Sequence, residues 1–181
     1  MKGIVFTELL EMVEDKFGIE MVDDMIQQSD LKSEGVYTSI GTYDFFEMQQ
    51  LLAVLSTKTG ISIDDLVYTY GLFFFSVLYK HHPNIFELYH DPLEFLASIE
   101  NHIHVEVRKM YPDAELPTFE VLLKDDRQIE MIYSSERSMY MFAKALMEKT
   151  FEHYNQPVKL TMEKLNEQGT KVYFKLASLN Q

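Results

Sequence analysis

The spacing of hydrophobic residues changes part-way along the chain. In the first 110 residues, hydrophobic side chains recur every three to four positions, the period of an α-helix with a buried face. After Pro117 they recur at every second position, which is typical of β-strands with one buried face. The pattern predicts helices first and a mixture of helix and strand afterwards.

Start and stop signals divide the first part into separate helices. Gly18 ends the first helix, Ser62-x-x-Asp65 starts the longest, and Asp91-Pro92 starts the last. The stretch "GLFFFSVLY" in the longest helix is apolar nearly all round, so that helix should be buried on more than one side. The expected ranges are 3–17, 20–28, 44–58, 62–82, 84–89 and 92–110.

Two hairpins and one more helix are expected in the second part. "TFEVLLK" and "IEMIYSS" flank the turn "DDRQ", and "VKLTMEKL" and "KVYFKLAS" flank "NEQGT". A helix over about 137–154 separates the two hairpins. The fold class predicted is therefore α+β, with a helical part followed by a ββαββ unit that forms an antiparallel sheet.

Composition excludes several classes of function. The 181 residues suit one domain, and the absence of cysteine excludes disulfides, thiolate nucleophiles, zinc–thiolate sites and cysteine-ligated iron–sulfur clusters. The net charge of −13 argues against binding to nucleic acid or to anionic membranes. No apolar run is long enough to cross a bilayer, and the start lacks a signal-peptide pattern, so we expect a cytoplasmic protein.

Two histidines, His102 and His104, lie in the helix expected over 92–110. Positions two apart on a helix do not face each other, so they do not form a metal-binding pair. His104 lies roughly 80° from the centre of the apolar stripe of this helix, and His102 roughly 120° away on the other flank. These angles on a helical wheel favour His104 as the residue that points inward, although His104 and His102 could both lie at the boundary between the buried and the solvated face. The stripe consists of Leu96, Ile99, Ile103, Val107 and Met110.

A second group of polar residues follows Pro117, in the stretch "YSSERSM". Tyr133, Ser135 and Arg137 stand two positions apart, so in an extended chain their side chains would point to one side. Three donors, one of them a cation, beside a helix N-terminus are suited to binding carboxylates. The alternative is a helix cap at Ser135 next to a surface arginine.

These features together resemble the haem nitric oxide/oxygen-binding (H-NOX) family of bacterial gas sensors, which is related to the haem domain of soluble guanylate cyclase. The resemblance rests on "MKG" at the start, the helix stop "STKTG", His104, Pro117 and the Y-x-S-x-R motif, in that order. It covers the whole chain.

The resemblance implies one H-NOX domain over residues 1–181, with haem b held between two subdomains. The helical distal subdomain would cover about 1–62 and the mixed proximal subdomain about 63–181. Some members of the family carry a cysteine-containing zinc site, and no zinc is expected here because the chain has no cysteine.

Specific roles are also implied by the resemblance. His104 would be the proximal ligand of the haem iron. Tyr133, Ser135 and Arg137 would bind the haem propionates, and Pro117 would press on the porphyrin and distort it. A haem site needs such an axial base and anion clamp together with apolar walls.

The residues expected opposite His104 predict which gas is bound. Alignment on the family motifs puts Phe142, followed one turn later by Leu146, where oxygen-binding members carry a tyrosine. It puts Phe74 where those members carry a polar helper, and Val5 and Leu9 would complete an apolar wall. Bound dioxygen is held by a hydrogen-bond donor, and nitric oxide needs none. We therefore expect a nitric oxide sensor, with carbon monoxide as a further ligand.

A mechanism and a partner are implied by the same resemblance. Nitric oxide would weaken or break the bond between iron and His104, and the shift between the subdomains would be the signal. These 181 residues contain no output domain, so we expect a separate signalling partner, a histidine kinase or a cyclic-di-GMP enzyme by family analogy. The chain itself is not expected to be an enzyme.

Other functions remain open at this point. A haem enzyme such as a peroxidase needs a distal acid–base group, and none is placed for that role. The 13 Phe, 11 Tyr and 11 Met could instead line the site of a non-haem apolar-ligand carrier or interaction domain. An oxygen-binding haem sensor could use Tyr140, although that residue should face about 160° away from Phe142 on a helix.

Overall fold

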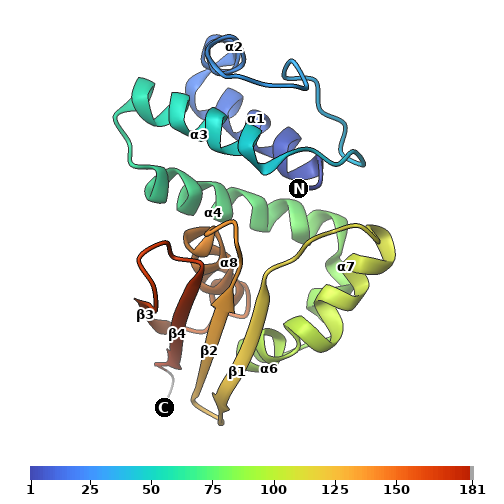
Figure 1. Ribbon diagram of the computed structural model, residues 1–181. Coiled ribbons are helices and arrows are strands. Elements are labelled where there is room, and N and C mark those ends of the chain that lie inside the picture. Colours follow the sequence, from blue (N-terminus) through green and yellow to red (C-terminus); the bar gives the residue numbers. More distant parts are fainter. Residues whose placement is uncertain (180–181) are drawn as a thin grey trace.

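The computed structural model describes residues 1–179, with helices above and beside an antiparallel sheet (Figure 1). The elements follow the sequence pattern to within a few residues at most ends. The helices are α1 (Ile4–Phe17), α2 (Ile19–Gln28), α3 (Phe45–Thr59), α4 (Ile63–His81), α5 (Pro83–Glu87), α6 (Pro92–Ala97), the π-helical segment η1 (Ile99–Ile103), α7 (His104–Met110) and α8 (Tyr140–His153). The strands are β1 (Thr118–Lys124), β2 (Gln128–Ser134), β3 (Val158–Lys164) and β4 (Lys171–Ser178).

The two predicted hairpins form one four-stranded antiparallel sheet in the order β1-β2-β4-β3. The alternation of β2 buries Ile129, Met131 and Tyr133, the face that the two-residue period predicts. Helix α8 covers this face and contributes Met147 and Phe151 to the same core. The α+β class and the ββαββ order are therefore confirmed.

Helix α4 lies between the helical half and the sheet half (Figure 1). Its residues Leu66 and Tyr70 belong to the core shared with α1 and α3, whereas Phe75 belongs to the core shared with α8 and the sheet. This explains why the helix is apolar nearly all round. The change from one half to the other therefore runs along α4 rather than at a single residue.

A glycine allows α4 and α8 to pack closely. A methyl group added at Gly71 would lie 2.7 Å from the Cβ of Ala145 and 2.8 Å from the carbonyl oxygen of Phe142. Any larger residue would force the two helices apart, so Gly71 determines how near α8 lies to α4.

The single helix expected over 92–110 is broken into three pieces, which corrects that prediction. The N–H groups of Ile103 and His104 donate to carbonyls five residues back, on Ser98 and Ile99. This π turn begins one residue after α6 and ends where α7 begins. The helical wheel assumed a constant 100° per residue and could not show the change in phase.

The helix expected from 137 begins instead at Tyr140. Ser138 has a positive φ of 51°, so residues 135–139 form a turn between β2 and α8. Arg137 therefore lies in that turn and not in the first turn of the helix.

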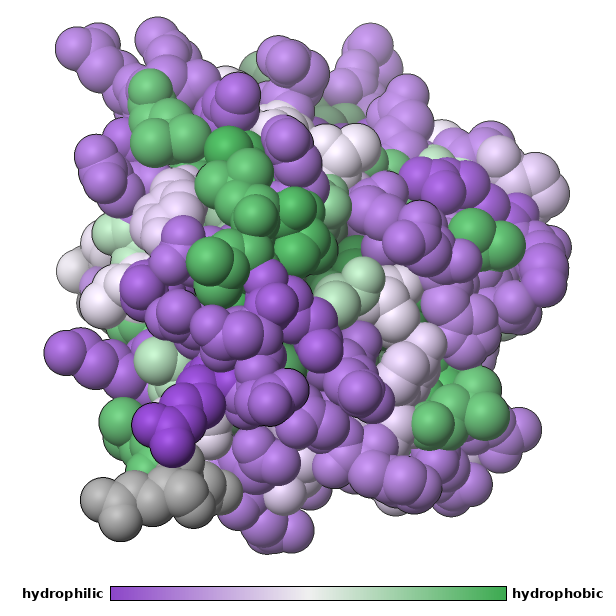
Figure 2. Space-filling view, turned by 90° about the horizontal axis from the view of Figure 1, so that it is seen from below, coloured by the Kyte–Doolittle hydropathy of each residue, from purple (hydrophilic) through white to green (hydrophobic). Residues whose placement is uncertain are grey.

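Within residues 1–179, no helix taken by itself has both the length and the apolar character needed to cross a membrane. Helices α3 and α4 satisfy both only when taken together, and they bend by 109° at their junction. The surface seen from below is largely hydrophilic with a group of hydrophobic side chains (Figure 2).

Candidate ligand-binding cavity

A cavity of about 320 Å³ lies where the N-terminal segment, α4, η1, α7, β1 and α8 meet. Nearly all of the site residues expected from the sequence line it. They are Val5, Phe74, His104, Pro117, Tyr133, Ser135, Arg137, Phe142 and Leu146. Leu9 does not line the cavity: it is fully buried in the core of the helical half, which corrects its expected place in the distal wall.

One wall of the cavity is apolar and comes from α1, α4 and α8. The rings of Phe74 and Phe142 lie 5.4 Å apart, and both contact the ring of Tyr70. Val5 and Leu146 extend this surface. Because α4 and α8 are held together at Gly71, this wall is tightly packed.

The phenol groups nearest to this wall are engaged elsewhere. The hydroxyl of Tyr70 donates to the carbonyl oxygen of Val5 at 2.7 Å, and burial raises the pKa of Tyr70 far above its ordinary value. Tyr140 donates to the carboxylate of Asp64 at 2.5 Å and is not among the residues that line the cavity. The side chain of Tyr140 therefore points away from the cavity, as the helix phase predicts.

His104 is the buried imidazole of the opposite wall. It is 8% exposed, and its Nδ1 lies 3.0 Å from the Oε1 of Glu100, one turn earlier. Burial lowers the pKa of His104, while the charge and hydrogen bond of Glu100 oppose that shift. His102 instead bonds the hydroxyl of Tyr89 at 2.7 Å and does not line the cavity.

Several polar residues beyond those predicted as site residues also line the cavity, among them His82 and Thr150. His82, at the end of α4, lines it, and burial lowers the pKa of His82. It lies eight residues beyond Phe74, about 12 Å along the helix axis. Thr150 also lines the cavity, but its hydroxyl donates to the carbonyl oxygen of Leu146 at 2.8 Å.

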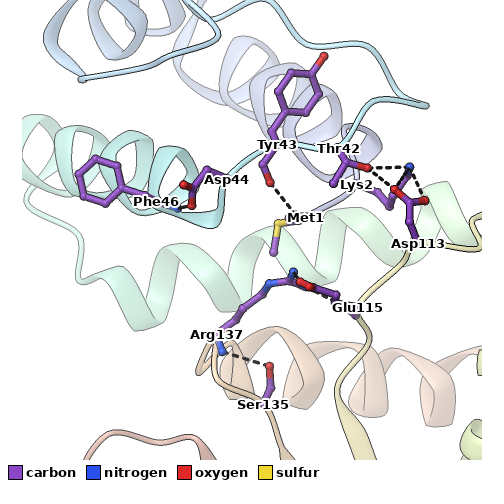
Figure 3. Close-up of polar contacts among 10 residues, drawn as sticks. All are labelled: Met1, Lys2, Thr42, Tyr43, Asp44, Phe46, Asp113, Glu115, Ser135 and Arg137. Carbon is purple, nitrogen blue, oxygen red and sulfur yellow. Dashed lines mark hydrogen bonds and ion pairs between the residues drawn. The ribbon is translucent and has the colours of Figure 1, made fainter.

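The three residues of the Y-x-S-x-R motif meet at one end of the cavity. Tyr133 is buried at the end of β2, and burial raises its pKa while a hydrogen bond with Ser135 opposes the change. The backbone N–H of Arg137 donates to the hydroxyl of Ser135 at 3.2 Å, which orders the turn (Figure 3). The cation is positioned by this turn rather than by a helix N-terminus.

The guanidinium of Arg137 is held by Glu115 on the segment before Pro117. Its Nη1 donates to the carbonyl oxygen of Glu115 at 2.7 Å and its Nη2 pairs with the carboxylate (Figure 3). Glu115 is 82% exposed at its side chain, so an anion inside the cavity could share this arginine. No local pattern marks Glu115, because its partner lies 22 residues further on.

The same segment is joined to the helical half by a second polar contact. Asp113 accepts from the Nζ of Lys2 at 3.0 Å and from the hydroxyl of Thr42 at 2.6 Å (Figure 3). Both donors lie more than 70 positions away in sequence. The segment between α7 and β1 is therefore fixed at Asp113 and at Glu115, shortly before Pro117, which lines the cavity.

The donor set and the walls of this cavity fit haem. Haem is a flat apolar disc with two carboxylates at one edge, and it needs an axial base, an anion-binding group and apolar walls. Here a buried imidazole, a group of two hydroxyls and a guanidinium, and aromatic and aliphatic walls surround one cavity.

The model of the Haem-NO-binding family matches residues 2–162 of the chain. Among curated proteins, none matches the sequence significantly. The fold is similar to that of the Fe(II) unliganded H-NOX protein from K. algicida, with 58% identity, a TM-score of 0.98 and coverage of 100% of this chain and 98% of that chain.

Two more distant structures have the same fold. The IWP-051-bound H-NOX from Shewanella woodyi in the Fe(II)CO state has 36% identity and a TM-score of 0.82, over 98% of this chain and 94% of that one. An H-NOX protein from S. oneidensis in the Fe(II)NO state has 25% identity and a TM-score of 0.90, over 99% of this chain and 100% of that one. With the family match over nearly the whole length, the chain belongs to the Haem-NO-binding (H-NOX) family of gas-sensing haem domains.

Proposed function

We propose that this chain is a haem b sensor of nitric oxide that discriminates against dioxygen. H-NOX domains bind haem and sense gases, so the question for this member is which gas its cavity accepts. The observation that carries the proposal is the wall opposite His104, where Val5, Phe74, Phe142 and Leu146 offer no hydrogen-bond donor from their side chains.

The engaged hydroxyls near this wall support the proposal. Tyr70, Tyr140 and Thr150 each donate to an oxygen of the protein, at 2.7, 2.5 and 2.8 Å respectively. A hydroxyl that left its protein acceptor would lose about as much as it gained from a gas. The oxygen-sensing alternative based on Tyr140 loses its donor, because Tyr140 faces Asp64.

We assign the other cavity residues by their chemistry. His104 would be the axial base, Tyr133, Ser135 and Arg137 would bind the propionates, and Pro117 would press on the face of the ring. When bound, haem would supply the iron that His104 and the gas both bind, and nitric oxide would weaken or break the bond of His104 to it. Carbon monoxide would bind at the same position.

The chain's own contribution to the signal lies in what carries His104. His104 is the first residue of α7, and α7 leads into the segment that contains Asp113, Glu115 and Pro117. A displacement of His104 would move that segment against Lys2 and Thr42 of the helical half. We propose that a separate protein, a histidine kinase or a cyclic-di-GMP enzyme, reads this change.

Absorption spectra of the reduced haem-loaded protein in nitrogen, air and nitric oxide test the proposal. We expect a large spectral change with nitric oxide and no stable oxygen complex in air. A stable oxygen complex would refute the selectivity, and a protein that takes up no haem would refute the whole assignment and favour the non-haem carrier.

Three histidine variants test the axial ligand. His104→Gly should lose haem and regain it when imidazole is supplied, because imidazole can fill the vacated position. His102→Ala and His82→Ala serve as controls, the first as a neighbour in sequence and the second as the other histidine at the cavity. Loss of haem from either control with retention in His104→Gly would mean that another histidine is the ligand.

A further inference from the structure

Glu100 makes two contacts that connect the buried imidazole with the sheet. Its Oε1 lies 3.0 Å from the Nδ1 of His104 and also 3.0 Å from the backbone nitrogen of Phe119, the second residue of β1. An ionised carboxylate can only accept, so both nitrogens donate to this one oxygen. One acceptor thus ties His104 to β1, two residues after Pro117.

The π turn places Glu100 for this role. Glu100 lies within η1 and His104 directly after it, so the two side chains are four positions apart on one side of the helix. The side chain of Glu100 is 29% exposed and that of His104 is 10% exposed, so solvent weakens their interaction less than at the surface. Because β1 is an edge strand of the described sheet, this contact also provides the N–H of Phe119 with an acceptor.

The contact fixes which ring nitrogen of His104 carries the proton. A hydrogen bond from Nδ1–H to a carboxylate leaves the lone pair on Nε2, the nitrogen that can bind a metal. The negative charge also makes that lone pair more basic. Arg108, whose charge lowers the pKa of His104, acts against this effect from the next turn.

We propose that Glu100 is a positioning residue that holds His104 in the Nδ1–H tautomer and sets the strength with which His104 binds iron. This rests on the proposed function, because it concerns how firmly the axial base is held. The more strongly His104 binds iron, the less readily a bound gas breaks that bond. Glu100 would therefore set how readily gas binding releases the histidine.

The first test needs no haem. In the haem-free protein, the nitrogen NMR signals of the His104 ring should show one tautomer, with the proton on Nδ1. Glu100→Ala should give a mixture of tautomers, because no carboxylate then holds the proton. An unchanged single Nδ1–H tautomer in Glu100→Ala would overturn the proposal, even if the chain bound no haem at all.

The second test uses the reduced haem-loaded protein and Glu100→Gln, which keeps the size of the side chain and removes its charge. We expect a lower iron–histidine stretching frequency in the resonance Raman spectrum. We also expect loss of haem to be about 10-fold faster, the lower end of the roughly 10- to 100-fold effect of removing a group that hydrogen-bonds a metal ligand. The fraction of nitric oxide complex without the histidine bond should rise.

Glu106→Gln is the matched control. Glu106 lies two residues after His104, pairs with Lys109 at 2.6 Å, and has no contact with the imidazole among those of the described residues. Glu106→Gln removes the same charge from the helix that carries His104 without removing a contact of the imidazole, so the frequency should stay at the wild-type value. An equal frequency in Glu100→Gln and wild type, or an equal shift in both variants, would overturn the proposal.

Discussion

The two walls of the cavity are built in different ways. The wall opposite His104 comes from α4 and α8, long helices that approach closely at Gly71 and bury Phe74 and Ala145. The His104 wall comes from a π turn and a seven-residue helix, in which His104 is the only buried residue. Long packed helices resist displacement, whereas short interrupted ones have few neighbours to hold them.

The difference shows where a signal can arise. The apolar stripe of η1 and α7 faces the cavity, so these segments rest on whatever fills the cavity as much as on the protein itself. Their fixed points are polar contacts at Glu100 and Asp113. A bound group can therefore change the position of this wall while the other wall stays in place.

The largest expected effect comes from truncating one aromatic side chain of the wall opposite His104, which we call the packed wall. Phe74→Ala should lower the free energy of unfolding of the haem-free protein by about 3–5 kcal/mol, because the buried ring packs against Tyr70 and Phe142. Ile103→Ala on the other wall should cost less than about 2 kcal/mol, since Ile103 is only partly buried. Urea unfolding measures both, and equal losses would contradict the comparison.

Overfilling the packed wall should have the next largest effect. Gly71→Val places atoms within 3 Å of Ala145 and of the carbonyl oxygen of Phe142, so we expect a loss of about 1–3 kcal/mol in unfolding free energy. Ser76→Val, at an exposed position of the same helix, is the control for the branched side chain. A similar loss in the control would mean that the contact with α8 is unimportant.

A donor added to the packed wall should change the choice of gas. Phe142→Tyr places a hydroxyl at the cavity with no protein acceptor assigned to it. A neutral hydrogen bond contributes about 0.5–1.5 kcal/mol, so oxygen dissociation should slow by up to about tenfold. Oxygen binding followed by absorption spectroscopy in both proteins measures this. A variant that binds oxygen no better than wild type would argue against the donor-free wall as the cause of selectivity.

The smallest effect is expected at the exposed contact of Asp113, on the segment that follows the His104 wall. Hydrogen bonds from Thr42 and Lys2 lower the pKa of Asp113 from its ordinary 3.8 to about 2. Because the folded state has the lower pKa, the contact stabilises the fold fully above about pH 4, and this is lost as the pH falls towards 2. Between pH 4 and pH 2, Asp113→Asn should therefore lose less stability than the wild-type protein. Thermal unfolding at a series of pH values measures this. Identical pH profiles would mean that the contact is weak in solution.

Much of the fold could be predicted because its elements are local patterns. The two-residue alternation of β2, the stop at Gly18 and the start at Ser62 each depend on a few neighbouring residues, and the structure confirms them. The stripe from Leu96 to Met110 also lines the cavity as one surface.

The remaining features depend on contacts between distant segments or on a change of helical period. Glu115 and Asp113 find partners 22 and 111 positions away, and no local pattern records such pairs. Leu9 fits the spacing of an inward-facing residue, but the sequence cannot tell which of two interiors it faces. The π turn is invisible to a wheel that assumes one fixed period.

The π turn before His104 determines what a one-residue deletion at this place in the chain would do. A π turn is equivalent to an α-helix with one inserted residue, and each residue of an α-helix turns the chain by about 100°. Deleting one residue between Glu100 and His104 would restore a regular helix and leave α7 in nearly the same phase against α6, because the π turn absorbs the extra residue. Homologues that lack this one residue would then present the same side chains of α7 to the cavity, although Glu100 and His104 would no longer be four positions apart.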